Sequence, residues 1–337
     1  MGGRGICVAG NMIVDKLYSV TGLPKPGELT SIQEDITHTT GGALCNVITD
    51  LAVMDPVLSL TALGRVGTDD EGDFILRTLG RYRNIDLSMI KRGGKTSFTA
   101  VMADIISKER TFFHYRGTNA LFCEDDIDWD TITSGFLHIG YILLLDALDG
   151  EDPVYGTKMA RLLCHARERG IKTSLDVVSE LGDRSKRILP PALKYTDYCI
   201  INEVEAGQVT GIALRDNAGK LIDANVPKAL EEIMKLGVSR WVVIHSPEGG
   251  YGLDNNGKFA ESPTVNVPPG YIKGKVGAGD AFCAGTIYAA YKGKSLEEGL
   301  ELGNAAAAAS LSEPGSTEGM LPVGELQKLR GRLERSP

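Results

Sequence analysis

The stretch Gly277-Ala278-Gly279-Asp280 places two glycines, a small residue and a carboxylate directly before an apolar helical pattern. Glycine allows a tight turn and lets the backbone come close to a ligand. The first N–H groups of a helix have no partner inside the helix, and the helix dipole favours negative charge there. The amides of Gly277, Ala278 and Gly279 are therefore predicted to hold a phosphate.

Asp280 lies one residue beyond this predicted phosphate site, where a carboxylate repels an anion unless it has a chemical role. We predict that it acts as a general base and takes the proton of a hydroxyl group that attacks phosphorus. The alternative is a helix N-cap, a role that Asp fills well. Taken alone, the short motif does not decide between the two.

Short apolar segments alternate with helical patterns along most of the chain. Strands are expected at residues 6–9, 57–63, 136–140, 172–176, 197–201 and 241–245. Helices are expected at residues 40–54, 68–79, 153–169, 203–209, 226–236, 279–292, 296–311 and 323–334. This alternation predicts an α/β fold with a mostly parallel sheet covered on both faces. Such sheets bind ligands at the carboxyl ends of their strands.

A smaller second sheet is predicted from β-rich segments. Residues 96–105 and 110–115 indicate a hairpin, and the alternating segment 30–36 indicates an exposed strand beside it. The predicted domains follow from this. Residues 17–37 and 96–118 form a β lid, and residues 1–16, 38–95 and 119–337 form the α/β core.

Composition narrows the class of protein. The chain has 337 residues, a net charge of −8 and no block of like charge, so a nucleic-acid partner is not expected. No apolar run reaches membrane-spanning length, and no signal peptide is recognised at the start. The six cysteines form no C-x-x-C pair and indicate reduced core thiols. A cytoplasmic protein with no membrane partner is expected.

The chain resembles the ribokinase-like carbohydrate kinases, the phosphofructokinase B group, over nearly its whole length. Four pieces occur in the order found in that family: Gly10-Asn11…Asp15, Gly41-Gly42…Asn46, Asn202-Glu203-Val204-Glu205 and Gly277-Ala278-Gly279-Asp280. The resemblance implies a three-layer sandwich with a β-sheet lid. It also implies ATP-dependent phosphorylation of a sugar hydroxyl and a homodimer formed through the lid.

The resemblance assigns roles to individual residues. Asp280 matches the catalytic base, and the amides of 277–279 match the anion hole. Asn202 and Glu205 match an element near Mg²⁺ and the ATP phosphates, with Glu205 reaching the metal through water. The alternative for this pair is a capping box, which the same spacing predicts; both roles can hold together.

On the acceptor side, Asp15, Gly41, Gly42 and Asn46 match sugar-contacting positions of the family. Arg116 lies in a segment similar to one that faces the sugar in fructokinases and 2-keto-3-deoxygluconate kinases. Its guanidinium is suited to a carboxylate or phosphate on the substrate. The alternative is a solvated arginine at the end of a hairpin.

On the nucleotide side, His245, Gly249 and Asn304 match positions of the ATP site. Two segments depart from the family pattern. His245 and Gly249 lie in His-Ser-Pro-Glu-Gly-Gly, where the family has Thr-x-Gly-x-x-Gly. Gly274-Lys275-Val276 replaces an Asp and Thr that help to bind a monovalent cation, so use of such a cation is left open, with Lys275 as a candidate substitute for its charge.

These observations together predict a kinase for a small sugar or sugar acid that uses ATP and Mg²⁺. Two alternatives stay open at this point. A nucleoside kinase would keep the chemistry and change the acceptor. A sugar-sensing protein on the same fold would have lost phosphoryl transfer, and the two departures from the family pattern motivate that alternative.

Overall fold

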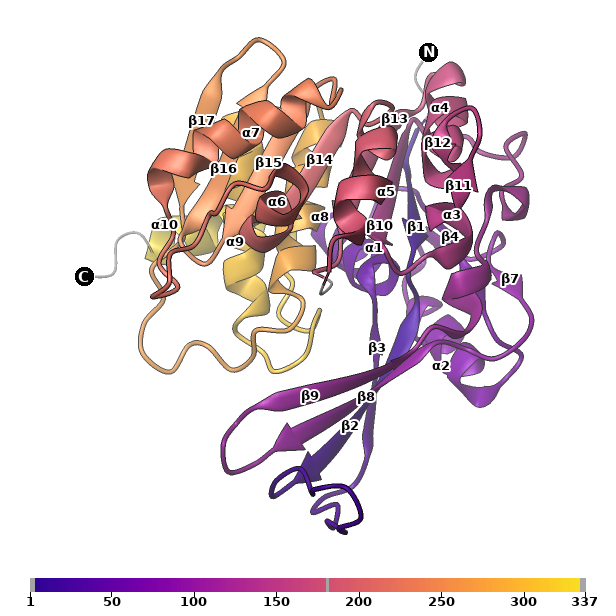
Figure 1. Ribbon diagram of the computed structural model, residues 1–337, viewed down its shortest axis with the longest axis vertical. Helices are drawn as coiled ribbons and strands as arrows, with labels where there is room; N and C mark the ends of the chain where they lie inside the picture. Colours follow the sequence, from indigo (N-terminus) through magenta and orange to yellow (C-terminus); the bar gives the residue numbers. More distant parts are fainter. Residues whose placement is uncertain (1–3, 180–181, 334–337) are drawn as a thin grey trace.

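One large β-sheet forms the middle layer of the molecule. The computed structural model describes residues 4–179 and 182–333 (Figure 1). Across this sheet the described strands follow the order β17 (Phe259–Pro263), β16 (Gly249–Asp254), β15 (Trp241–Ser246), β14 (Tyr198–Asn202), β13 (Lys172–Val177), β10 (Phe136–Ile142), β1 (Ile6–Gly10), β4 (Leu60–Leu63) and β6 (Ile85–Asp86). The strands from β6 to β15 in this order are parallel to one another. Only β16 and β17 pair antiparallel, so the predicted mostly parallel sheet is confirmed.

The two faces of the sheet bury separate cores, because successive residues of a strand point to opposite sides. Ile6 and Val8 belong to one core, and Cys7 and Ala9 to the other. The first core is covered by α1 (Ala43–Met54), α2 (Asp70–Leu79), α8 (Ala278–Tyr291), α9 (Leu296–Ser310) and α10 (Val323–Leu333). The second core is covered by α4 (Lys158–Glu168), α5 (Arg184–Leu193), α6 (Glu203–Thr210) and α7 (Val226–Lys235). The result is the predicted three-layer sandwich.

One predicted helix begins later in the structure than expected, and one helix was not predicted. The helix predicted over 153–169 begins only at Lys158, after the short hairpin β11 (Glu151–Asp152) and β12 (Gly156–Thr157). Thr157 caps it by accepting from the Ala160 amide at 3.1 Å. Helix α5 was not predicted; it contains two prolines, which oppose a helical pattern. Residue 334, the predicted end of the last helix, lies outside the described residues.

A four-stranded sheet extends below the core as the lid (Figure 1). Its order is β3 (Thr37–Gly41), β2 (Ile13–Val20), β8 (Phe98–Asp104) and β9 (Arg110–Tyr115). The predicted 96–115 hairpin is confirmed. The strand predicted at 30–36 is wrong: these residues form irregular, mostly exposed chain, and their alternating isoleucines bury no face. The predicted boundaries after residues 16 and 37 cut through β2 and β3, which run from the core into the lid.

The remaining elements are short. They are β5 (Arg65–Val66), β7 (Lys91–Arg92), α3 (Asp146–Asp149) and the 3₁₀ turns η1 (Gly117–Leu121), η2 (Glu124–Asp126) and η3 (Asp223–Asn225). Within residues 4–179 and 182–333, every helix is too short or too polar to cross a lipid bilayer.

Candidate active site

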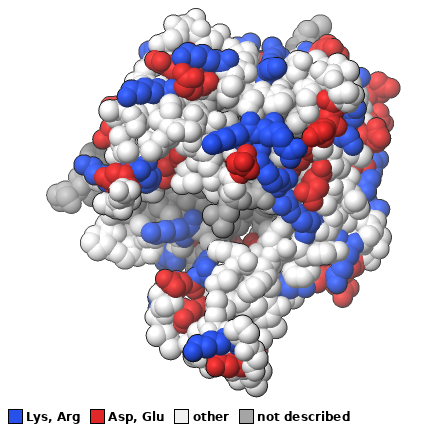
Figure 2. All heavy atoms as spheres, viewed as in Figure 1, with Lys and Arg blue, Asp and Glu red and all other residues white. Residues whose placement is uncertain are grey.

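The carboxyl ends of β10, β13, β14 and β15 meet the start of α8 at one edge of the sheet. A cavity of about 230 Å³ lies there, where parallel α/β sheets bind ligands. Its lining residues are Tyr141, Asp176, Val177, Val178, Ser179, Asn202, Glu205, His245, Gly277, Gly279 and Asp280. Of the predicted residues, Gly277, Gly279 and Asp280 therefore share one cavity with three others: Asn202, Glu205 and His245. Figure 2 shows the surface hollowed where the lid meets the core.

The anion loop requires glycine at its first position. Gly277 is the N-cap of α8 with φ of +80°, and a Cβ there would collide with the carbonyl oxygen of Ser316. The first helical hydrogen bond runs from the Ala281 amide to the Gly277 carbonyl at 2.8 Å. The amides before Ala281 have no partner inside the helix, and they form the positive end of the helix dipole. This geometry suits a phosphate held by backbone donors.

Asp280 does not cap its own helix, so the N-cap alternative is wrong for this residue. It is 3% exposed, and its Oδ2 accepts from Asn46 Nδ2 at 2.7 Å and from the Tyr141 hydroxyl at 3.2 Å. Burial raises the pKa of Asp280 to about 6, while the bonds from Asn46 and Tyr141 act to lower it. A carboxylate with this pKa is mostly ionised at neutral pH and is a stronger base than an exposed one.

Asn46 contacts Asp280 directly. Its Nδ2 donates to Asp280, and its Oδ1 accepts from the Ser316 hydroxyl at 3.0 Å. The side chain is buried between α1 and the chain that follows α9. The sugar contact predicted for Asn46 stays a prediction; what the structure shows is that Asn46 joins Asp280 to Ser316.

The other predicted acceptor residues lie at the root of the lid. Asp15 of β2 pairs with Thr39 of β3, and Gly41 leaves room for its carboxylate, which a Cβ would meet. Gly42 has φ of +86° and packs against Asn11. Burial raises the pKa of Asp15 to about 6, with Thr99 lowering it and Asp280 raising it.

Asn11 was noted in the first family motif but received no role. It is 1% exposed, and its Nδ2 has no hydrogen-bond partner among the described residues. A buried amide donor without a partner is costly, and Asn11 lies against Gly42. It is therefore available to an acceptor hydroxyl.

Asn202 and Glu205 form the capping box that their spacing predicts. The Glu205 amide donates to Asn202 Oδ1, and the Asn202 amide donates to Glu205 Oε2, both at 2.9 Å. The Glu205 carboxylate also accepts from Ser179 at 2.8 Å, and it still lines the cavity. Burial raises its pKa to about 7. The capping role and a metal-linked role are thus compatible.

Asp176 was missed by the sequence analysis. It is the penultimate residue of β13, lines the same cavity and is 6% exposed. Burial, followed by the charges of Glu205 and Asp280, raises its pKa well above the usual value for Asp. Buried carboxylates that disfavour one another's charge suit a hard divalent cation. Mg²⁺ keeps several waters and binds through one or two carboxylates and substrate phosphates, so Asp176 and Glu205 fit it.

In the segment 245–250, which departs from the family pattern, the carboxylate of Glu248 is paired with an arginine. The Glu248 carboxylate accepts from Arg215 Nη1 at 2.6 Å and from Nη2 at 2.9 Å, and Arg215 also pairs with Glu203. The Arg215 hydrogen bond lowers the pKa of Glu248 to about 2. The unexpected carboxylate is therefore neutralised by an arginine of the same chain, which removes one motive for the sensor alternative.

The other nucleotide-side predictions fall in different places. The His245 ring lies 5.0 Å from the Phe282 ring and lines the cavity, and burial lowers its pKa to about 4, so it is neutral. Gly249 opens β16, outside the cavity lining. Asn304 is buried in α9, where its Nδ2 donates to the Ser262 and Pro263 carbonyls of β17 at 2.8 and 3.2 Å. A nucleotide contact for Gly249 and Asn304 stays a prediction.

Arg116 follows β9 and turns toward the loop after β10. Its Nη1 donates to the Leu143 carbonyl at 2.6 Å and lies 3.3 Å from Asp146 Oδ1. It is outside the cavity lining, and its predicted substrate contact stays a prediction.

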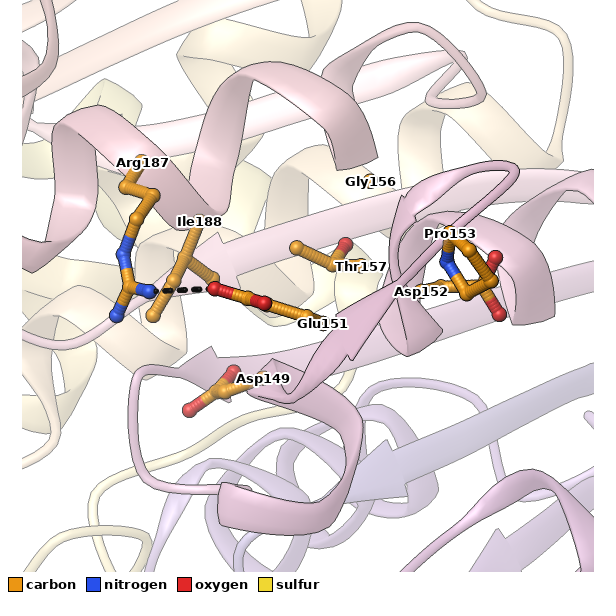
Figure 3. Close-up of a pocket in the computed structure, with 8 residues that line it drawn as sticks. All are labelled: Asp149, Glu151, Asp152, Pro153, Gly156, Thr157, Arg187 and Ile188. Carbon is orange, nitrogen blue, oxygen red and sulfur yellow. Dashed lines mark hydrogen bonds and ion pairs between the residues drawn. The ribbon is translucent and has the colours of Figure 1, made fainter.

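A second cavity of about 310 Å³ lies between α3, the β11–β12 hairpin and α5 (Figure 3). Figure 3 shows an ion pair between Arg187 and Glu151 on one side and Asp149 below it. None of the predicted site residues lines this cavity.

Comparison with known proteins decides the family. The model of the pfkB family carbohydrate kinases matches residues 4–323. The chain belongs to this family. A sugar kinase of Archaeoglobus fulgidus is 24% identical over 77% of this chain and 93% of its own length. An ATP-dependent ribose-1-phosphate kinase of Halopiger xanaduensis is 26% identical over 91% of this chain and 92% of its own length.

The fold of this kinase matches solved ribokinases. The structure of Arabidopsis thaliana ribokinase complexed with ribose and ATP superposes with a TM-score of 0.80 at 21% identity, covering 97% of this chain and 98% of that one. The predicted ribokinase-like fold is therefore confirmed, and the chain is a sugar or nucleoside kinase.

Tyr141 and Asp176 are two of the lining residues that sequence reasoning missed; Val177, Val178 and Ser179 are the others. Tyr141 and Asp176 each stand at the carboxyl end of a strand that was correctly predicted, 136–140 and 172–176. That position was the available signal, because the ends of parallel strands carry the ligand-binding side chains.

Proposed function

We propose that this kinase transfers the γ-phosphoryl group of ATP to a hydroxyl of a small sugar or sugar acid. The observation that carries the proposal is a single cavity lined by the Asp280 carboxylate, the glycines of the anion loop and Glu205. Phosphoryl transfer needs positioning and charge stabilisation more than covalent chemistry, and these groups supply both.

In this proposal Asp280 accepts the proton of the acceptor hydroxyl as that oxygen attacks phosphorus. The amides at the start of α8 face the charge that builds on the transferring group, and they need no reorganisation because the helix fixes them. His245, which is neutral because burial lowers its pKa to about 4, adds no positive charge that would compete for the phosphate. Water has poor access because Asp280 is almost fully buried.

Glu205 and Asp176 are the residues that would hold Mg²⁺, Glu205 through water. When bound, the metal neutralises phosphate charge and orients the phosphates. Glu205 is kept in place by Asn202 and Ser179. ATP is the proposed donor. Whether the enzyme uses a monovalent cation, or Lys275 replaces its charge, stays a prediction.

The acceptor is proposed to lie between the base and the root of the lid. Asp15, Asn11 and the backbone at Gly41 and Gly42 offer the acceptors and donors that vicinal hydroxyls require, and such a site rejects analogues without them. Arg116 is proposed to reach an anionic group of a sugar acid or sugar phosphate. The ribose-1-phosphate named for the Halopiger xanaduensis relative is one acceptor of that charge class.

The lid is proposed to join two copies of the chain. Its exposed apolar side chains include Phe112 at 62%, Phe113 at 56% and Ile32 at 48% exposure. Strands β3 and β9 leave open edges, and exposed edges and apolar patches favour association. A chain with two of these residues made polar should elute as a monomer; an unchanged elution volume would contradict a lid dimer.

The experiment that tests the kinase activity is ADP release with Mg²⁺–ATP and a panel of sugars, sugar acids, sugar phosphates and nucleosides. Turnover with a sugar, sugar acid or sugar phosphate supports the proposal. Turnover only with a nucleoside identifies the second kinase class. Ligand-dependent stabilisation without turnover identifies a sensor.

A further inference from the structure

Tyr141 is presented by an unusually strained turn at the end of β10. Tyr141 has φ of +59° and Leu143 has φ of +88°; Lys108 is the remaining non-glycine residue with positive φ among those described. The pairing of β10 with β13 also shifts register between Ile139 and Ile142. Strained residues of this kind persist only where their surroundings hold them, and they cluster at active sites.

The strained turn is held by side chains from three other elements. The Leu143 amide donates to Asp149 Oδ1 at 3.3 Å. The Leu143 carbonyl accepts from Arg116 at 2.6 Å and from Arg184 at 3.2 Å. Arg184 also lies 3.7 Å from Asp149 Oδ2, which closes the contact into a ring. We name Arg116, Arg184 and Asp149 the turn clamp.

The turn carries the Tyr141 hydroxyl onto the base. This hydroxyl donates to Asp280 Oδ2 at 3.2 Å, beside the Asn46 amide at 2.7 Å. Asn46 is itself fixed by Ser316. Both donors thus bind the same carboxylate oxygen, Tyr141 from β10 and Asn46 from α1. Among the described residues, no hydrogen bond reaches Asp280 Oδ1.

We propose that Tyr141 is a positioning residue for the base. With Asn46 it fixes Oδ2 of Asp280 and leaves Oδ1 to take the proton of the acceptor, and the turn clamp keeps Tyr141 in place. The inference rests on the proposed phosphoryl transfer, in which Asp280 is the base. The hydrogen bond from Tyr141 stabilises the ionised carboxylate of Asp280 and sets its orientation.

The hydroxyl of Tyr141 can only donate in this place. Burial, with the charges of Asp280, Asp176 and Glu205, raises the pKa of Tyr141 well above its usual value, so it keeps its proton. Other titratable groups lie around Asp280 on the neighbouring elements: Asp15 of β2, Cys45 and Asp50 of α1, Asp176 of β13, Glu205 of α6, His245 of β15 and Cys283 of α8. Glu318 beyond α9 acts on Asp50. The test must therefore separate Asp280 from these groups.

Tyr141→Phe removes the hydroxyl and keeps the ring. Losing this bond should raise the pKa of Asp280, so the acid limb of kcat/KM should move up by about 0.5 to 1 pH unit. At pH 6 the rate then falls about two- to five-fold beyond any loss at pH 8, where the base is ionised in both proteins. Tyr288→Phe is the matched control, because Tyr288 donates to Asp55 at 2.9 Å far from the cavity. It should leave the pH profile unchanged.

The turn clamp is tested by Arg184→Gln, with Arg187→Gln as its control. Arg187 lies one turn further along α5 and pairs only with Glu151 among the described contacts (Figure 3). Arg184→Gln should shift the acid limb in the same direction as Tyr141→Phe, by a smaller amount, although Tyr141 is intact. An unshifted limb in Arg184→Gln removes the clamp from the proposal.

A thermal measurement tests Tyr141 without relying on catalysis. A higher pKa of Asp280 in Tyr141→Phe increases the cost of the buried charge at pH 8, where the carboxylate is ionised. The Tm difference between the unmodified chain and Tyr141→Phe should therefore be about 1 to 2 °C larger at pH 8 than at pH 5. In an Asp280→Asn background this pH-dependent part should vanish. Its persistence there, or an unshifted acid limb in Tyr141→Phe, overturns the inference. Absence of turnover in the unmodified chain instead refutes the proposed function, and the thermal test then still decides the Tyr141 contact.

Discussion

Replacing Asp280 by asparagine is expected to make the protein more stable while it removes activity. The carboxylate is 3% exposed, and burial raises its pKa from 3.8 to about 6. The shift of roughly two units means that holding this charge in the folded state costs about 3 kcal/mol at neutral pH. The asparagine side chain keeps an oxygen for Asn46 and Tyr141 and carries no charge, so most of that cost disappears.

The pH dependence follows from the direction of the shift. Below pH 3.8 the carboxyl is protonated in both the folded and the unfolded chain, and the penalty is absent. Between 3.8 and about 6 the unfolded chain ionises first, so stability falls as pH rises. Above about 6 the penalty is constant. For a chain of 337 residues, Asp280→Asn should therefore raise Tm by about 4 °C at pH 8 and by about 2 °C at pH 5.

Differential scanning calorimetry at pH 5, 6, 7 and 8 measures this difference. Asp35→Asn, at an exposed acid in the irregular chain before β3, is the control and should change Tm by less than about 1 °C at each pH. A Tm gain for Asp280→Asn that is equal at pH 5 and pH 8 would refute the charge-burial reasoning. A loss of stability at pH 8 would refute it too.

Three further outcomes follow from the site. In the unmodified chain, kcat/KM should fall about ten-fold per pH unit below pH 6, because Asp280, with a pKa of about 6, must be ionised to accept a proton; a flat profile from pH 5 to 7 contradicts this role. Gly277→Ala should destabilise the fold by about 2 kcal/mol and abolish turnover, whereas Gly211→Ala, with φ of +73° and open space for a Cβ, should cost about 1 kcal/mol and leave turnover intact; equal effects on Tm and rate contradict the steric argument. Glu205→Gln should raise the Mg²⁺ concentration for half-maximal activity about ten-fold or more without lowering Tm, because the raised pKa of Glu205 makes its buried charge a cost in the folded state; an unchanged Mg²⁺ curve would count against the metal-linked role.

The sequence predicted the core well, because its signals are local. Buried parallel strands appear as short apolar runs, and the amphipathic helices between them have clear periods. The segment 30–36 misled because alternation of isoleucines with polar residues also occurs in exposed chain. Helix α5 was missed because two prolines obscure its pattern, and tertiary contacts with α4 and α6 hold it in place.

The part of the site that consists of short sequence motifs was predictable. Asp280, the anion loop and Glu205 were placed from short motifs and proved to line one cavity. The position of Tyr141 at the end of a predicted strand could have marked it as a candidate, but its contact with Asp280 was not predictable, because that contact depends on a backbone with positive φ and on Arg184, which lies 43 positions further along the chain. Such long-range support leaves no local trace in a sequence.

The central claim is that Asp280 takes the acceptor's proton during phosphoryl transfer. The most direct measurement is the single-turnover rate of γ-phosphoryl transfer at pH 7.5, with the acceptor found in the panel, in the unmodified chain and in Asp280→Asn, together with ATP affinity in both. The account predicts a rate at least about 100-fold lower in Asp280→Asn, with ATP affinity changed less than about three-fold. A rate within about three-fold of the unmodified chain would contradict it.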